Sequence, residues 1–243
     1  MSEPQTAASR LAALQQREAE NRDRVLRHLE NGVEFWSLDN VFIGPEVEIE
    51  AGAVILPGTI LKGRTRVGAD SVIGPNSLLE DAAVGRGTVF NASQGYRCTI
   101  GEGAKIGPFV HIRPDSVIGD EVKVGDFVEV KNSTIGRGTS IAHLTYVGDS
   151  DVGSHCNFGC GVVTVNYDGE HKQRTVIEDF AFIGCTTNLV APVRVGEGAY
   201  TAAGSTVTKD VPAGALGIAR ARQVNMEGWA EKKLAAYKEK HSK

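Results

Sequence analysis

The chain has 243 residues, of which 41% are hydrophobic and 23% charged, and its formal net charge is −4. This balance gives no basic surface for nucleic acid, and no apolar run approaches the roughly 18 residues that a membrane span requires. The N-terminus lacks the apolar segment of a signal peptide, so we expect a cytoplasmic protein without nucleic-acid or membrane partners. The four cysteines have no CxxC spacing, so we expect reduced thiols and no metal site.

The N-terminal segment, residues 1–40, is predicted to be a helical linker. Residues 6–30 are predicted to form one helix, and Gly32 provides its stop signal. The apolar positions of this helix are Leu11, Leu14, Val25, Leu26 and Leu29. A trimeric coiled coil is an alternative, although Glu18 and Arg22 interrupt the heptad pattern.

Residues 41–212 carry a large apolar residue at every sixth position, in series separated by slips and interruptions. The positions are Ile43, Ile49, Ile55, Leu61, Val67, Ile73, Leu79, Ile100, Ile106, Ile112, Ile118, Val124, Val130, Ile135, Ile141, Val147, Val152, Phe158, Ile177, Ile183, Leu189 and Val195. Neither the helical period of 3.6 nor the strand period of two produces this spacing. A helical bundle and a β-meander are therefore excluded as the main architecture.

A period of six fits a triangular coil in which each hexapeptide makes one short strand and one corner. Three hexapeptides then complete a coil, and the apolar residues stack in a central column. Small residues two positions earlier, such as Ala53 and Thr59, can also point inward, and glycine suits the corners. We expect large aromatic residues not to fit so thin a column. The predicted fold class is all-β, a parallel β-helix with an N-terminal helix and a short C-terminal helical tail.

Two interruptions of the period are predicted to be loops, because solenoids place insertions on one face. They lie at residues 91–98 and 165–176, and the second one, VNYDGEHKQRTV, breaks the period completely. After Val211 and Pro212 the chain is expected to leave the coil. Residues 213–243 are then a tail, with a short helix predicted at 229–240 and a basic end that faces solvent.

Three cations could hold a phosphate group. Arg113 and Lys131 are 18 residues apart, one nominal coil, so they are expected on the same face in adjacent layers. Arg113 would bind a phosphate by paired hydrogen bonds, and Lys131 and Lys172 would act as point charges. The alternative is that each is an ordinary solvated surface cation.

His143 is the candidate general base. It follows Ile141 by two residues, so it is expected at an exposed corner, where an imidazole can accept a proton from an attacking amine. The alternative is a corner residue that merely packs against Tyr146. Asn157 and Asn166 could orient sugar hydroxyls or the reacting carbonyl, or could simply stabilise corners.

The chain resembles one half of a bifunctional bacterial enzyme family. The shared motifs are RPDS, VEVKN, HLTYVGD, NYDG, LVAPV, AAGSTVT and ARQ. They resemble the acetyltransferase half of the N-acetylglucosamine-1-phosphate uridyltransferase/glucosamine-1-phosphate N-acetyltransferases, which are hexapeptide-repeat acyltransferases. The resemblance implies a left-handed β-helix, a homotrimer with active sites between subunits, and a role in making UDP-N-acetylglucosamine for peptidoglycan. Nothing resembles the family's GxGTRM nucleotide-binding start, so uridyl transfer is not expected.

The resemblance also implies roles for individual residues. His143 is the implied general base, and Asn166 the residue that positions the amine or the carbonyl. The implied ligands of glucosamine 1-phosphate are Arg113, Lys131, Tyr146, Asn157 and Lys172. The implied acetyl-CoA contacts are Cys160, Asn166, Tyr167, Cys185, Ala203 and Arg220, the last of which would meet a CoA phosphate. Cysteine replaces the family's Ala at 160 and Ser at 185, and main-chain contacts are expected to persist at both positions.

The expected reaction is direct transfer of the acetyl group from acetyl-CoA to the 2-amino group of glucosamine 1-phosphate. Backbone amides would stabilise the oxyanion, and neither an acetyl-enzyme nor a metal is required. One alternative is acyl transfer to another amino sugar, and another is a non-catalytic scaffold or trimerisation module. A carbonic anhydrase of the same fold is disfavoured because the histidines do not share a spacing that would align them; these are His111, His143, His155 and His171.

Overall fold

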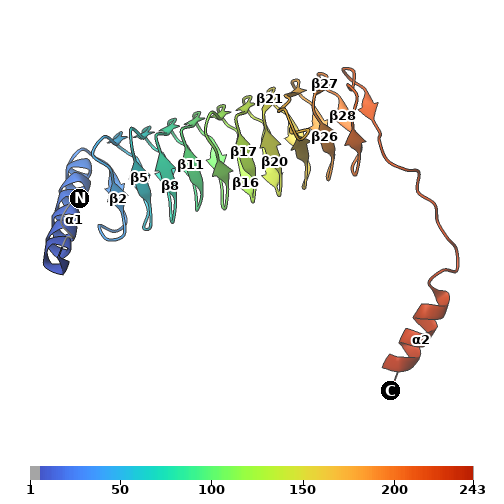
Figure 1. Cartoon of the computed structure of the whole chain (residues 1–243), viewed down its shortest axis with the longest axis horizontal. Helices are drawn as coiled ribbons and strands as arrows, with labels where there is room; N and C mark the ends of the chain where they lie inside the picture. The colour runs from blue at the N-terminus through green and yellow to red at the C-terminus, as the bar shows by residue number, and fades with distance from the viewer. Residues whose placement is uncertain (1–5, 243) are drawn as a thin grey trace.

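The computed structural model describes residues 6–242, with Lys232 by its backbone alone, and shows a long parallel β-solenoid between two helices (Figure 1). The strands form three parallel sheets of 11, 10 and 9 strands, which are the three faces of a prism. We call them faces A, B and C. The architecture is consistent with the expected left-handed β-helix. Residues 1–5 and 243, which belong to the predicted terminal segments, lie outside the described residues.

The strands are short, and each coil crosses the three faces in turn. Face A contains β1 (Glu34–Phe35), β4 (Val54–Ile55), β7 (Val72–Ile73), β10 (Val89–Phe90), β13 (Lys105–Ile106), β16 (Lys123–Asp126), β19 (Ser140–His143), β22 (Asn157–Phe158), β25 (Phe182–Ile183), β28 (Tyr200–Thr201) and β30 (Leu216–Gly217). Face B contains β2 (Phe42–Ile43), β5 (Ile60–Lys62), β8 (Leu78–Glu80), β11 (Gln94–Tyr96), β14 (His111–Ile112), β17 (Glu129–Lys131), β20 (Tyr146–Gly148), β23 (Val163–Val165), β26 (Asn188–Val190) and β29 (Thr206–Val207). Face C contains β3 (Glu48–Ile49), β6 (Arg66–Val67), β9 (Ala83–Val84), β12 (Thr99–Ile100), β15 (Val117–Ile118), β18 (Thr134–Ile135), β21 (Ser150–Val152), β24 (Thr175–Ile177) and β27 (Val193–Val195).

The core is the stack of residues that recur at every sixth position. All of the predicted apolar positions are buried, so the inner column is confirmed. Parallel register places equivalent residues above one another, as with Ile55 and Ile73 on face A. Small hydroxyl side chains two positions earlier also point inward. The buried hydroxyl of Thr59 has a hydrogen-bond partner, because Thr59 Oγ1 donates to the Leu56 carbonyl at 2.7 Å.

The prediction that large aromatic residues do not fit the column is wrong at Phe158 and at Phe90, which are both buried on face A. The ring of Phe90 is fully buried, and the inward position of the next strand, β11, is Gly95, which pairs with Leu79 and Ile112. A Cβ at position 95 would lie 2.8 Å from Leu79 Cδ2 and 3.5 Å from Phe90 Cζ. The missing side chain of Gly95 thus avoids a clash with Leu79, and it leaves the Phe90 ring in an already filled layer. The loop predicted at 91–98 is also wrong, because this segment contains β11 and stays within the coil.

The first helix, α1 (Ala7–Glu30), closes the N-terminal end of the solenoid. Thr6 caps it by accepting from the Ser9 amide at 3.2 Å. Asn21 donates to the Val41 carbonyl at 2.8 Å and accepts from the Ile43 amide at 2.9 Å, and Arg24 donates to the Ile43 carbonyl at 2.7 Å. These bonds satisfy backbone groups of the first strand on face B, which would otherwise be an open sheet edge.

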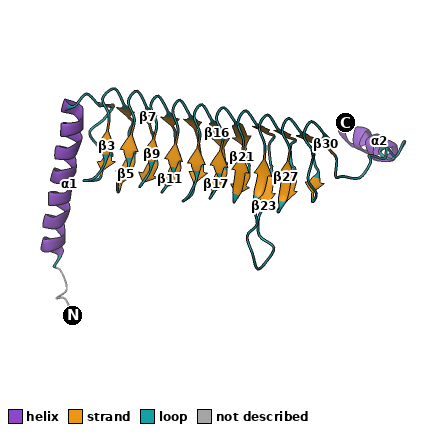
Figure 2. Cartoon of the chain, turned by 90° about the horizontal axis from the view of Figure 1, so that it is seen from above, coloured by secondary structure: helices purple, strands orange, loops and turns teal. Residues whose placement is uncertain are grey.

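Two segments leave the prism further along the chain. The loop between β23 and β24 projects outward, as expected for the NYDG segment (Figure 2). After β30 the chain runs away from the solenoid to α2 (Glu231–His241), close to the predicted helix at 229–240 (Figure 1). Among residues 6–242, no helix combines the length and apolarity needed to cross a membrane.

The corners between faces A and B carry bulky apolar residues in an unusual backbone conformation. Phe109, Phe127 and Leu144 have φ values of 58°, 57° and 48°, a region that favours Gly, Asn and Asp. Their side chains are about three-fifths exposed, and the rings of Phe109 and Phe127 stack with centroids 5.3 Å apart. We call these three residues the apolar ridge.

Candidate active site

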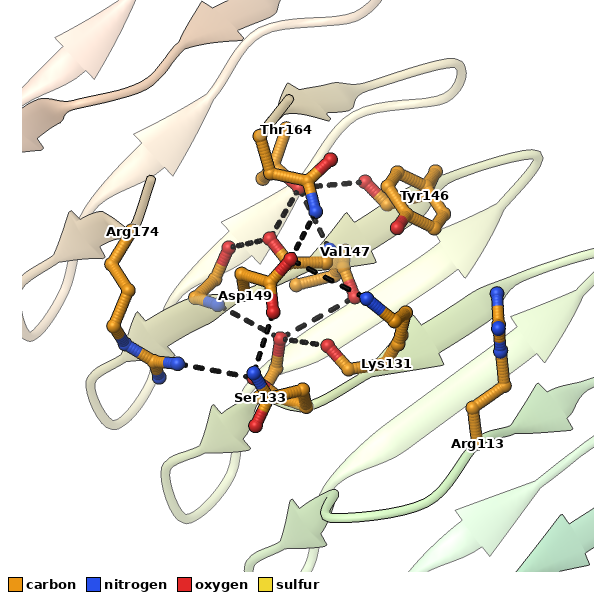
Figure 3. Close-up of polar contacts among 12 residues, drawn as sticks. Arg113, Lys131, Ser133, Tyr146, Val147, Asp149, Thr164 and Arg174 are labelled. Atoms are coloured by element: carbon orange, nitrogen blue, oxygen red, sulfur yellow. Dashed lines mark hydrogen bonds and ion pairs between the residues drawn. The ribbon is translucent and has the colours of Figure 1, made fainter. Parts of the chain in front are cut away.

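A buried carboxylate organises the corner between faces B and C, just after β20. Asp149 accepts hydrogen bonds from the Asn132 amide at 2.5 Å and from the Asn166 amide, and Lys131 Nζ lies 3.5 Å from its Oδ2 (Figure 3). Its side chain is only 5% exposed. Burial alone raises the pKa of Asp149, but the two amide donors and the Lys131 charge outweigh burial and hold this pKa below its usual value.

The predicted phosphate cations meet at this corner. Arg113, Lys131 and Lys172 line a cavity of about 350 Å³; its other lining residues are Pro114, Asp115, Asn132 and Asp149. The prediction that Arg113 and Lys131 share a face in adjacent layers is confirmed by the pairing of β14 with β17. Arg113 Nη1 is held 2.8 Å from Glu129 Oε1, which fixes the direction of the guanidinium.

The two lysines of the cavity influence each other. Contact with Lys172 and the charge of Asp149 raise the pKa of Lys131, whereas contact with Lys131 and then the Lys131 charge lower the pKa of Lys172. A dianionic phosphate in the cavity would relieve this crowding of positive charge. The arrangement therefore suits an anion more than a neutral ligand.

Tyr146 lies on face B beside this cavity. It pairs in register with Glu129, and its hydroxyl reaches along the strand to Gly148, where an added Cβ would lie only 2.3 Å from the hydroxyl oxygen. Gly148 in turn pairs with Lys131. The Tyr146 side chain thus extends along its strand toward Gly148, the neighbour of Lys131, and away from His143, against which the alternative interpretation would pack it. Figure 3 shows Tyr146 near Lys131 and Arg113.

The loop after β23 delivers Lys172 to the cavity. Its base is closed by the Gln173 amide, which donates to the Asn166 carbonyl at 2.8 Å, and by an antiparallel bridge between Tyr167 and Lys172. At its tip, Asp168 Oδ1 accepts from the His171 amide at 2.6 Å. Asn166 is 9% exposed and is tied to Asp149, whereas Tyr167 is 56% exposed.

A second group of predicted residues forms a column along the corner between faces A and B. Asp126 pairs with His143, and the same register continues through Cys160 and Cys185 to Ala203. Backbone bonds mark each step; they run from Gly161 N to His143 O (3.2 Å), from Thr186 N to Cys160 O (2.7 Å) and from Gly204 N to Cys185 O (2.8 Å). We call His143, Cys160, Cys185 and Ala203 the corner column. Its members are exposed and about 4.8 Å apart.

Arg220 lies at the far end of the corner column. An added Cβ on Gly204 would be 3.8 Å from Arg220 Cδ, so the guanidinium side chain lies against the residue that follows Ala203. The column therefore runs from an imidazole at one end to a cation at the other. An extended ligand with a reactive group at one end and phosphates at the other has this polarity.

Asn157 stands apart from both groups. It faces outward on face A, where it pairs with Ser140 and Phe182. Two faces of a three-sided prism point in different directions, so a sugar phosphate held at Arg113 by face B lies away from Asn157 of the same chain. One chain thus places the predicted residues at two corners and on two faces.

Sequence reasoning missed Asp149 and its partner Asn132. The motif HLTYVGD contained Asp149, but the spacing did not single it out, because the one-residue shortening after Val147 also follows Leu79 and Val130. A separate cavity of about 630 Å³ lies over face C at Arg64 and Arg97; it shares only Asp115 with the cationic cavity and contains none of the predicted site residues. Across the described residues, no three His, Cys, Asp or Glu side chains gather as metal ligands would.

The sequence is similar to a family of bacterial transferases and to two GlmU proteins. Residues 97–132 match the family model described as bacterial transferase hexapeptide (six repeats). The match lies within the solenoid and identifies hexapeptide repeats of the transferase type in this segment. The bifunctional protein GlmU of Caldanaerobacter subterraneus subsp. tengcongensis is 52% identical over 220 residues, 88% of this chain and 48% of that protein. GlmU of Geobacillus sp. is 52% identical over 221 residues, 90% of this chain and 48% of that protein.

Over about nine-tenths of its length the chain aligns with the acetyltransferase part of GlmU, and the family match lies within the aligned solenoid. It spans about half the length of the curated relatives it matches. Among solved structures, it is similar to a Francisella novicida UDP-N-acetylglucosamine acyltransferase, with 20% identity, a TM-score of 0.44, and coverage of 80% of this chain and 72% of that one.

Proposed function

We propose that the chain is a glucosamine-1-phosphate N-acetyltransferase of the cytoplasm that uses acetyl-CoA and gives N-acetylglucosamine 1-phosphate and CoA. The observation that carries the proposal is the corner column, which sets His143 in register with three predicted acetyl-CoA contacts drawn from distant parts of the sequence. The resemblance of the chain to GlmU over nearly its whole length supports the same reaction.

In the proposed reaction, the amine nitrogen of the sugar attacks the thioester carbonyl, and His143 accepts the proton that this nitrogen loses. The tetrahedral intermediate collapses with cleavage of the carbon–sulfur bond. The CoA thiolate leaves, and the proton held by His143 can return to it. No metal is invoked in any step. Asn166, held by Asp149, is proposed to orient the reacting groups.

The sugar phosphate is proposed to bind at the cationic cavity, with Arg113 giving paired hydrogen bonds and Lys131 and Lys172 giving charge. Acetyl-CoA is proposed to lie along the corner column, with its thioester near His143, its pantetheine arm past Cys160, Cys185 and Ala203, and a phosphate at Arg220. Tyr167 of the projecting loop is proposed to cover the acetyl end.

The active form is proposed to be a homotrimer whose active sites lie between subunits. Two observations support an oligomer. Asn157 and Arg113 occupy different faces of one chain, so a site that uses both requires two copies. The apolar ridge also exposes three bulky side chains in a strained conformation, which is the kind of surface that a neighbouring copy would cover.

The test is an assay of thiol release from acetyl-CoA in the presence of glucosamine 1-phosphate. Glucosamine and a UDP-linked amino sugar serve as competing acceptors, and we expect turnover with the 1-phosphate to exceed both. Faster turnover of another amino sugar would assign the chain to a different acyltransferase. No release with any acceptor, together with no acetyl-CoA binding by calorimetry, would leave a non-catalytic scaffold.

A further inference from the structure

Two cysteines lie directly above one another on adjacent coils. Cys160 and Cys185 occupy the same register position at the corner between faces A and B, because Phe158 pairs with Ile183 two residues earlier. Neighbouring strands of a sheet are about 4.8 Å apart, which falls within the Cα separation of roughly 4.4–6.8 Å seen in disulfides. Both cysteines are free and exposed.

The Cys185 side chain leans toward the coil that carries Cys160. Its Sγ lies 2.8 Å from the position that a Cβ on Gly159 would occupy. Because Gly159 has no side chain, the sulfur rests over the residue that directly precedes Cys160. A bridge requires χ1 rotamers of the two cysteines that bring their sulfurs to about 2.05 Å.

The other two cysteines have a different environment. Cys98 and Cys156 are buried, with exposures of 5% and 2%. Burial raises the pKa of the Cys98 thiol to about 12, and burial also raises the pKa of Cys156. Thiolates are the reactive species, so these two thiols are protected from exchange. They provide internal controls within the same chain.

We propose that Cys160 and Cys185 are a thiol modification site that exchanges with small disulfides such as glutathione disulfide and closes into a reversible bridge between two coils. The bridge would lie in the middle of the corner column. Its effect on catalysis rests on the proposed function, because that column is the proposed path of acetyl-CoA. Formation of the bridge does not depend on that assignment.

The exchange takes place in two balanced steps. A cysteine thiolate attacks one sulfur of glutathione disulfide, forming a mixed disulfide and releasing one glutathione thiolate. The second cysteine thiolate then attacks the protein-bound sulfur and releases the second glutathione. The two cysteines are oxidised by two electrons, and one glutathione disulfide is reduced to two glutathiones. Glutathione is smaller than acetyl-CoA, so an assembled enzyme that binds acetyl-CoA along the corner column, as proposed, would also admit glutathione there.

The experiment treats the whole chain with glutathione disulfide, blocks the remaining free thiols and maps the peptides by mass spectrometry without reduction. We expect a peptide pair linked through Cys160 and Cys185, and unmodified thiols at Cys98 and Cys156. Cys160→Ser and Cys185→Ser should each stop at a single glutathione adduct, because the resolving thiol is missing. Acetyl-CoA should slow the reaction of the wild type.

Activity is measured on the same samples, with each protein compared with its own reduced form. The oxidised wild type should lose nearly all acetyl transfer and recover it with dithiothreitol, whereas the Cys160→Ser/Cys185→Ser double variant should not respond to oxidation. Free thiols at 160 and 185 after treatment, or equal reaction of all four cysteines, would overturn the modification site. A bridge without loss of activity would overturn its effect on catalysis. A chain that forms the bridge but never transfers acetyl would instead refute the proposed function.

Discussion

At the residue scale, His143 is the side chain on which the proposed chemistry depends most. His143→Ala is expected to lower the rate by at least about 10²-fold, the usual contribution of a general base. The side chain is exposed, so the assembly and the melting temperature should stay those of the wild type. Thiol release measures the rate, and light scattering measures the assembly. His155→Ala, at an exposed corner outside the site, is the matched control, and a near-normal rate for His143→Ala would remove it from the role.

Asp149 links stability to pH at the same scale. Asp149→Asn should lower the free energy of unfolding by about 1–3 kcal/mol at neutral pH, because the ion pair and charge-assisted hydrogen bonds at a buried site are weakened. Asp23→Asn, on the exposed surface of α1, controls for the loss of one carboxylate.

The stability difference between wild type and Asp149→Asn should depend on pH in one direction. The pKa of Asp149 is lower in the folded state, so its stabilisation is complete above the unfolded pKa of about 3.9 and is lost as pH falls through the folded value. The difference in free energy of unfolding between wild type and Asp149→Asn should be constant above about pH 5 and should become smaller below about pH 4. Denaturant unfolding at a series of pH values measures it, and a gap that stays constant down to acid pH would contradict the assignment.

At the element scale, β10 and β11 are coupled through one missing side chain. Gly95→Ala should lower the free energy of unfolding by about 1–3 kcal/mol, because its Cβ would press on Leu79 in a filled core. Phe90→Leu replaces the neighbouring ring by a smaller side chain, which leaves space into which Leu79 and the new methyl group can shift. The double variant should therefore be more stable than the sum of the two single effects predicts. Denaturant unfolding gives this interaction energy, and strict additivity would show that the two positions do not share space.

The element scale also shows where sequence reasoning succeeded and where it failed. Helix α1 was predicted within one residue because its stop signal is local. The segment at 91–98 was predicted to be a loop because Gly95 hides the repeat, although its backbone pairs on both sides. A glycine at an inward position has no apolar side chain to mark it. Only the packing of Leu79, Cys98 and Phe90 around this position explains why glycine is there.

At the scale of the whole molecule, shared active sites predict complementation. Arg113→Ala and Asn157→Ala should each be impaired on their own. When the two are dissociated, mixed in equal amounts and reassembled, about one quarter of the sites should combine an intact Arg113 from one copy with an intact Asn157 from the other. Thiol release at subsaturating glucosamine 1-phosphate should recover toward that fraction of wild type. Reassembled single variants are the controls, and a mixture no more active than they are would place each site within one chain.

The sequence by itself determined the prism, because burying one side chain in every six is a one-dimensional pattern that any coil must repeat. It also determined which residue types were available for chemistry. Only the tertiary structure decided which of them meet. Phe158 stacks on Ile141 across 17 residues, yet Ile183 stacks on Phe158 across 25, because the NYDG loop lengthens one coil. Register depends on the sum of such slips, so the alignment of His143 with Cys160 and Cys185, and the burial of Asp149 among three donors, emerge only when the coils are stacked.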